Sequence, residues 1–82
     1  MPPADHRLTL VAKPGCPACD TARTELMRIA ADLGVPFDER DATADPADFA
    51  EYGDRLPVFL VDGAEHGYWA VEEARLRRAL AR

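Results

Sequence analysis

The chain has 82 residues, of which 48% are hydrophobic and 30% are charged, a composition typical of one folded domain and not of a disordered segment. Fifteen acidic residues against ten basic ones give a net charge of −5, which argues against nucleic acid or an anionic membrane surface as a partner. No stretch is as long and apolar as a membrane span or a signal peptide. We therefore expect a single cytoplasmic domain over residues 1–82, with a flexible tail over residues 1–7.

The first half of the chain predicts a buried strand followed by an amphipathic helix. Leu8–Ala12 is nearly continuous in apolar residues and is stopped by Pro14 and Gly15, which is typical of a central strand buried on both faces. Apolar residues then recur at steps of four, three and four, which predicts a helix that Gly34 ends in a left-handed conformation. This apolar stripe consists of Ala22, Leu26, Ile29 and Leu33.

The middle of the chain predicts an edge strand and a short helix. Residues 35–41 begin with alternating apolar side chains but end in four charged residues, a pattern that discourages unwanted strand pairing. Asp45 and Pro46 form a helix cap and a first-turn proline. A short helix should therefore run to about Tyr52, with Phe49 as its main contribution to the core.

The last third of the chain predicts a hairpin and a closing helix. Asp62 and Gly63 separate residues 57–61 from residues 64–69, and Asp-Gly between strand-like segments is a strong hairpin signal. Residues 71–82 should be helical, because their acidic residues come first and their arginines last, which complements a helix dipole. The predicted order is β-α-β-α-β-β-α, an α/β fold in which the first two strands are parallel. The packing residues of the last helix are Ala74, Leu76, Ala79 and Leu80.

The chemistry is expected between Lys13 and Cys19, where the buried strand turns into a helix. Pro17 suits the first helical position, which makes Cys16 the helix cap. The Cys16 sulfur then faces unpaired N–H groups and the positive end of the helix dipole, and Lys13 adds a nearby cation. These features stabilise a thiolate. Cys19 lies one turn further along, within reach of a disulfide, and should act second.

This arrangement predicts a dithiol cycle. Cys16 attacks a substrate disulfide, a mixed disulfide forms, and Cys19 releases the reduced substrate, leaving a Cys16–Cys19 disulfide for an unidentified reductant. A structural disulfide is a weak explanation, because so short a loop constrains the unfolded chain very little. A zinc site would need two more ligands, and we interpret His6 and His66 as surface residues.

With these residues placed, the chain resembles glutaredoxin-like members of the thioredoxin superfamily over residues 8 to about 80. Lys13 stands three residues before Cys16, and Cys16-Pro17-x-Cys19 follows the dithiol pattern of this family. Leu56-Pro57 occupies the place of the family's cis-proline loop. The resemblance implies a thioredoxin-like fold, with a four-stranded mixed sheet flanked by helices.

The resemblance also assigns a role to the loop at Leu56 and Pro57. It implies that the bond between them is cis and that the loop faces Cys16. The peptide groups of Leu56 would then pair with an extended substrate segment. Arg55, which precedes this loop, offers a partner for a ligand carboxylate, although a solvated surface arginine is the favoured interpretation.

The chain departs from the family at the positions that hold the carboxylate of glutathione. Gly67 keeps the first glycine of the usual pair, but Tyr68 takes the second place, and Ala70 and Val71 take the capping places. The sequence therefore leaves open whether glutathione is used. Tyr68 and Trp69 either form an apolar rim for a substrate or cover the core. We favour packing, because strand alternation sends one ring to each face.

We therefore expect a monomeric thiol–disulfide oxidoreductase with no metal and no cofactor beyond the Cys16–Cys19 pair. Its partners would be a disulfide-containing protein or a low-molecular-weight thiol compound, in addition to the reductant. Two alternatives remain open. One is a module that holds a metal ion or an iron–sulfur cluster through Cys16, as some glutaredoxin relatives do. The other is an interaction module with a vestigial dithiol, which presents Tyr68 and Trp69 to a partner.

Overall fold

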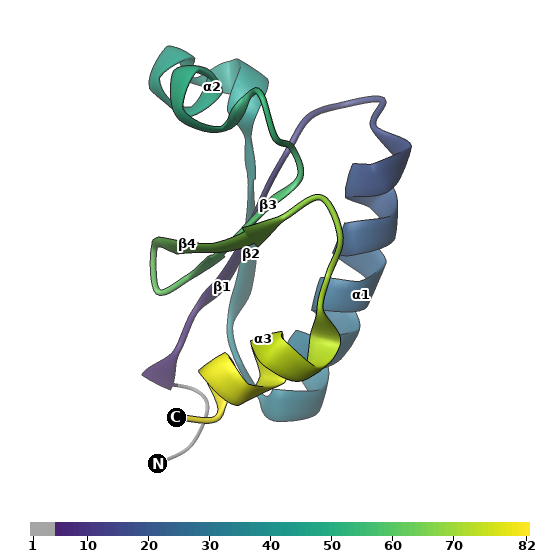
Figure 1. Cartoon of the computed structure of the whole chain (residues 1–82), viewed down its shortest axis with the longest axis vertical. Helices are drawn as coiled ribbons and strands as arrows, with labels where there is room; N and C mark the ends of the chain where they lie inside the picture. Colours follow the sequence, from purple (N-terminus) through teal and green to yellow (C-terminus); the bar gives the residue numbers. More distant parts are fainter. Residues whose placement is uncertain (1–4) are drawn as a thin grey trace.

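The computed structural model describes residues 5–82 and has the predicted order of strands and helices (Figure 1). A short 3-10 turn, η2, is an additional element between the second strand and the second helix. Within residues 5–82, no helix has both the length and the apolar character that crossing a bilayer requires. The elements are β1 (Leu8–Ala12), α1 (Pro17–Leu33), β2 (Phe37–Asp41), η2 (Ala42–Ala44), α2 (Pro46–Tyr52), β3 (Val58–Val61), β4 (Ala64–Tyr68) and α3 (Glu73–Leu80).

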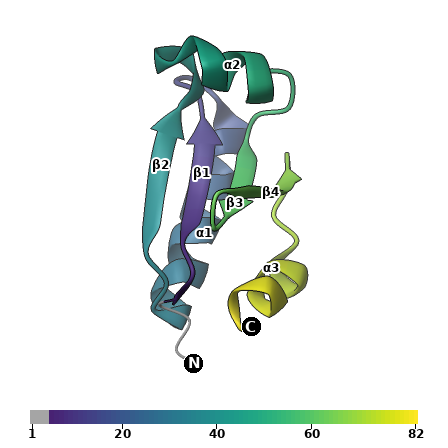
Figure 2. The ribbon, with the colours of Figure 1, turned by 90° about the vertical axis from the view of Figure 1, so that its left-hand side faces the viewer.

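The four strands form one mixed sheet in the order β2-β1-β3-β4 (Figure 2). β1 lies parallel to β2 and antiparallel to β3, and β4 lies antiparallel to β3. The central place of β1 explains why all five of its residues are buried, whereas β2 at the edge exposes its charged side chains. The predicted central strand, edge strand and hairpin are therefore confirmed.

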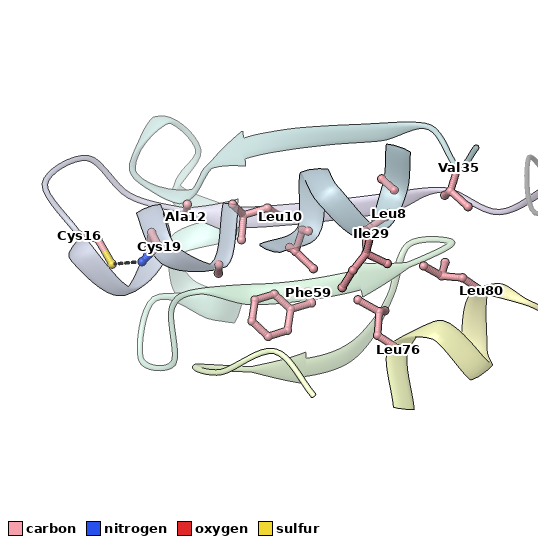
Figure 3. Close-up of a cluster of buried hydrophobic side chains, with 13 residues drawn as sticks. Leu8, Leu10, Ala12, Cys16, Cys19, Ile29, Val35, Phe59, Leu76 and Leu80 are labelled. Atoms are coloured by element: carbon pink, nitrogen blue, oxygen red, sulfur yellow. Dashed lines mark hydrogen bonds between the residues drawn. The ribbon is translucent and has the colours of Figure 1, made fainter. Parts of the chain in front are cut away.

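The main core lies between the sheet and the two helices α1 and α3 (Figure 3). Leu10 of β1 and Phe59 of β3 meet Ile29 of α1 and Leu76 of α3 in this cluster. A smaller cluster on the opposite face joins β1 and β3 to η2 and α2. Its buried members are Val11, Ala42, Val58 and Leu60, with Tyr52 and Leu56 packed against them.

Two expectations about packing are wrong. Phe49 is 53% exposed, because α2 lies beyond the end of the sheet (Figures 1 and 2). The residue of α2 that packs against the smaller cluster is Tyr52. Ala74 is also exposed, because α3 turns Leu76 and Leu80 toward the core, and Ala74 lies off that stripe.

The structure also differs from the expected tail at residues 6 and 7. His6 Nδ1 lies 2.7 Å from Asp62 Oδ2, and His6 Nε2 lies 2.8 Å from the main-chain oxygen of Arg82. The main-chain N–H of Arg7 donates to Asp62 Oδ1 at 2.8 Å. Asp62 of the hairpin therefore fastens the segment before β1. Residues 1–4 of the expected tail lie outside the described residues.

Candidate functional site

The loop between β1 and α1 delivers Cys16 to the N-terminus of α1, as the sequence predicts. Gly15 has a φ of +68°, which the tight turn from strand to helix requires and a side chain would resist. Cys16 is the cap, with extended backbone angles, and Pro17 opens the helix. The main-chain N–H of Cys19 donates to Cys16 Sγ at 3.1 Å (Figure 3). A donor aimed at the sulfur in this way stabilises negative charge on it.

The two sulfurs have different surroundings. Both cysteines are free thiols, and Cys16 keeps 8% of its surface exposed whereas Cys19 keeps none. Burial raises the pKa of the Cys19 thiol to about 11, and the hydrogen bond with Cys16 adds to this effect. Cys19 is therefore a neutral thiol near neutral pH, which agrees with its expected place as the second sulfur to react.

The loop at Leu56 and Pro57 lies at the same end of the sheet as the cysteines. The bond between these two residues is cis, as the resemblance implied. β3 starts where β1 stops, because Val58 is paired with Val11, so the residues just before β3 lie beside the start of the Cys16 loop. Leu56 packs against the same core cluster that contains Cys16.

Tyr68 and Trp69 lie at this end of the sheet as well, and both rings are exposed. Tyr68 is paired with Val58, and the N–H of Trp69 donates to the main-chain oxygen of Pro57 at 2.8 Å. The two residues are 46% and 61% exposed, and their rings meet edge to face with centroids 5.0 Å apart. The expectation of one ring on each face is wrong, because Trp69 has a φ of +69° and leaves the strand alternation. This placement favours a rim over core packing.

Arg55 is held by the protein's own carboxylates. Its guanidinium donates to both oxygens of Glu65, at 3.0 and 2.7 Å, and to Asp54 at 2.8 Å. It also lies over the ring of Tyr52, 5.7 Å from the centroid. The guanidinium of Arg55 is therefore not free to bind a ligand carboxylate. Its ion pairs join the loop before Leu56 to β4.

Lys13 is exposed and lines a hollow of about 230 Å³ beside the Cys16 loop. Arg23 lines the same hollow and donates to both oxygens of Glu39 at 2.7 Å and to Asp20 at 2.7 Å. The charge of Arg23 slightly opposes the rise in the pKa of Cys19. The charge pattern of residues 38–41 indicates only a device against strand pairing and does not predict this bridge. The sequence signal for a cation near the dithiol was the position of Arg23, one helical turn after Cys19 on α1.

The remaining candidate residues are Gly67, His66 and His6. Gly67 is paired with Phe59, and Glu65 with Leu60, so the strand bulges at His66 between them. The interpretation of His6 and His66 as plain surface residues is wrong: His6 is hydrogen-bonded to Asp62, and His66 is half-buried. Across residues 5–82, no group of three or more His, Cys, Asp or Glu side chains has the arrangement of a metal site.

The comparisons with known proteins agree with this geometry. Residues 7–81 match the family model of the glutaredoxin-like domain (DUF836). An uncharacterised protein of Mycobacterium tuberculosis strain H37Rv is 40% identical over 81 residues, which cover 93% of this chain and 84% of that protein. An uncharacterised protein of Mycobacterium bovis gives the same values.

Solved thioredoxins share the fold. Thioredoxin of Fasciola hepatica has a TM-score of 0.67 at 21% identity, covering 94% of this chain and 79% of its own. Mitochondrial thioredoxin 3 of Saccharomyces cerevisiae, in its oxidised form, has a TM-score of 0.67 at 18% identity, covering 94% and 77%. The cap cysteine, the cis-proline loop and the family match lead to one conclusion: the chain belongs to the glutaredoxin-like domain family and has the thioredoxin fold.

Proposed function

We propose that this protein is a thiol–disulfide oxidoreductase in which Cys16 is the attacking sulfur and Cys19 the resolving one. The observation that carries the proposal is the position of Cys16 Sγ at the start of α1, where it accepts the N–H of Cys19 beside the cis-proline loop. A sulfur in this place has a donor for its negative charge and a second thiol within one helical turn.

The cycle moves two electrons from the protein to the substrate. The Cys16 thiolate attacks one sulfur of a substrate disulfide, whose S–S bond breaks, and the departing sulfur leaves as a thiolate that takes a proton from water. Cys19 then gives up its proton to water and attacks Cys16 Sγ. The bond between Cys16 and the substrate breaks, and the second substrate sulfur leaves as a thiolate that takes a proton from water. The Cys16–Cys19 disulfide that remains is reduced by an external dithiol or by two thiols, which restore two electrons and two protons.

The surroundings of Cys19 support this order of events. Its thiol is fully buried and its pKa is raised, so in the resting protein it stays protonated and out of reach of a substrate. Cys16 retains an exposed fraction and lies at the end of the sheet that carries Leu56, Tyr68 and Trp69. A substrate can therefore reach Cys16 but not Cys19.

The substrate class within this proposal is a disulfide of a protein or of a small thiol compound, with the chain acting as a cytoplasmic monomer. The positions that would hold the carboxylate of glutathione carry Tyr68, Ala70 and Val71. Because Ala70 and Val71 have no polar side-chain group and Tyr68 replaces a glycine, we propose that glutathione is not bound through that clamp. The exposed rings of Tyr68 and Trp69 offer contact area to a substrate in its place.

A single-turnover experiment without added reductant tests the proposal. Reduced wild-type protein is mixed with insulin whose disulfides are intact. The reaction is quenched with acid, and the products are identified by mass spectrometry. We expect the wild type to lose two hydrogen atoms as its internal disulfide forms. Cys19→Ser should accumulate a covalent adduct with insulin, and Cys16→Ser should form none, because the buried Cys19 thiol cannot reach the substrate.

Two outcomes would contradict the proposal. One is a wild type that retains both thiols in the presence of excess disulfide-bonded insulin and of bis(2-hydroxyethyl) disulfide, a small substrate. The other is adduct formation at the same rate by Cys16→Ser and Cys19→Ser. In either case, iron, zinc and sulfide in the purified protein are measured next, since their presence would favour the metal-binding alternative.

A further inference from the structure

A second hollow, of about 390 Å³, lies between β4 and α3 and is unrelated to the cysteines. It is found toward the opposite end of the sheet, because Arg82 reaches back to His6, just before the start of β1 (Figure 1). Its volume is in the range of small-molecule sites. The hollow is lined by His66, Arg75, Arg78, Ala79 and Arg82.

The arginines of this hollow differ from the others in the chain. Within residues 5–82, no carboxylate of an Asp or Glu side chain forms an ion pair with Arg75, Arg78 or Arg82. Although the protein has a net charge of −5, the three arginines without a carboxylate partner in the described part of the chain all line this hollow. The arginines that do pair with carboxylates are Arg7, Arg23, Arg28, Arg40, Arg55 and Arg77.

The dipole of α3 does not account for this cluster. A cation in the last turn of a helix is stabilised by the dipole, which explains Arg78. Arg75 lies in the first turn, where the same dipole repels a cation. It is anchored there by its own hydrogen bond, in which Nη1 donates to the main-chain oxygen of His66 at 2.7 Å. The remaining N–H groups of Arg75 are thus held beside the hollow.

His66 adds an unused polar atom to the same place. The bulge of β4 leaves His66 as the extra residue between Glu65 and Gly67, and among residues 5–82 its buried Nε2 has no hydrogen-bond partner. A buried polar atom without a partner is costly, and a ligand that accepts or donates there removes the cost. Burial and the charge of Arg75 lower the pKa of His66, while Glu72 opposes this, so the ring is neutral and can donate one N–H.

We propose that this hollow binds the phosphate group of a small-molecule ligand, with Arg75, Arg78 and His66 as its donors. Guanidinium forks match the oxygens of a phosphate with two parallel hydrogen bonds, which an ammonium group cannot provide. A dianionic phosphate supplies the charge that the cluster lacks, and one of its oxygens accepts the N–H of His66. The site is separate from the proposed dithiol cycle and does not depend on it.

Titration of the full chain with inorganic phosphate at constant ionic strength tests this site, with binding followed by NMR of the His66 ring and of the arginine side chains. We expect saturable shifts at His66 and Arg78. Arg78→Gln should weaken phosphate binding about tenfold or more, because the loss of one hydrogen bond to a charged group changes the affinity by this amount. Arg77→Gln is the matched control, because it removes the same charge from the same helix but from a side chain paired with Glu73 and Asp32.

Three results would overturn the assignment, provided that the amide spectra show both variants to be folded. Phosphate shifts that do not saturate would show that no site exists. If Arg77→Gln and Arg78→Gln lower the affinity for phosphate equally, the binding is a general attraction of anions to positive charge. Acetate or citrate that binds more tightly than phosphate at the same ionic strength would assign the hollow to carboxylates. Cys16→Ser is expected to bind phosphate as the wild type does, which keeps this test apart from that of the dithiol.

Discussion

Burial of the Cys19 thiol affects the stability of the fold as well as its chemistry. Its pKa is raised from an ordinary value of 9.0 to about 11, so the unfolded chain loses this proton first as the pH rises. Between these two pH values the folded state binds more protons than the unfolded state, and the free energy of unfolding therefore falls as the pH rises. Urea titrations of the reduced protein should show this fall, and Cys19→Ala should make it shallower.

The comparison with Cys19→Ala reports on the Cys19 thiol together with its hydrogen bond to Cys16, because every other titratable side chain is present in both proteins. The alanine variant is expected to be less stable near neutral pH, since it loses a buried sulfur from the main core. The difference in stability between the two proteins should then shrink as the pH rises above 9.0. Parallel curves over this range would show that the Cys19 proton is not held by the fold.

Local sequence signals predicted the position of Cys16 at the start of α1 correctly, but not the positions of the aromatic and histidine side chains. The place of Cys16 follows from Pro17 alone, because a proline that opens a helix fixes the residue before it as the cap. The positions of Trp69 and His66 depend on contacts that alternation along a strand does not contain. One is the hydrogen bond from Trp69 to Pro57, just before the neighbouring strand β3, and the other is the bulge of β4 against β3.

Among the elements, α1 depends on the residue that ends it. Gly34 has a φ of +69° and its N–H bonds back to the oxygen of Ala30, while a Cβ added there meets nothing within 4 Å. Gly34→Ala should therefore cost about 1 kcal/mol of unfolding free energy, through the left-handed backbone alone. Gly34→Asn should cost less, because asparagine tolerates that conformation. Urea denaturation measures both, and equal losses in the two variants would contradict this explanation.

The element order could be read from the sequence because each helix has its own start and stop residues. Pro17 and Gly34 bound α1, and Asp45 caps α2 by accepting the N–H of Ala47 at 2.8 Å. η2 was missed although its signal is local, since Asp41 accepts the N–H of Thr43 at 2.8 Å in a compact turn. The exposure of Phe49 was not predictable, because it depends on where α2 lies relative to the sheet.

At the scale of the whole molecule, a chain of charges ties the two helices of the main core together. Arg28 of α1 pairs with Glu73 of α3 at 2.7 Å, Glu73 pairs with Arg77 at 2.8 Å, and Arg77 pairs with Asp32 of α1 at 2.8 Å. In the sequence, Glu73 and Arg77 indicate only a helix dipole. Their second role was hidden because the partners on α1 are 45 residues away.

Glu73 is shared by both arginines, and this makes it sensitive to acid. Hydrogen bonds from Arg28 and then Arg77 lower its pKa from 4.5 to about 2, so between these pH values the unfolded chain binds more protons than the folded one. The stability that Glu73 contributes is therefore fully present above 4.5 and is lost as the pH falls toward 2. The carboxylate is 39% exposed, so water and salt screen this contribution.

Glu73→Gln should lower the free energy of unfolding at neutral pH and flatten its decline in acid. Glu72→Gln removes the same charge at the adjacent position, and among residues 5–82 Glu72 has no ion-pair partner, so it should leave the decline as steep as in the wild type. Urea titrations at low salt across this pH range compare the three proteins. If Glu72→Gln and Glu73→Gln flatten the curve equally, net charge and not the bridge between α1 and α3 sets the acid stability. A difference confined to Glu73→Gln would mean that the bridge helps to hold α3 over the main core.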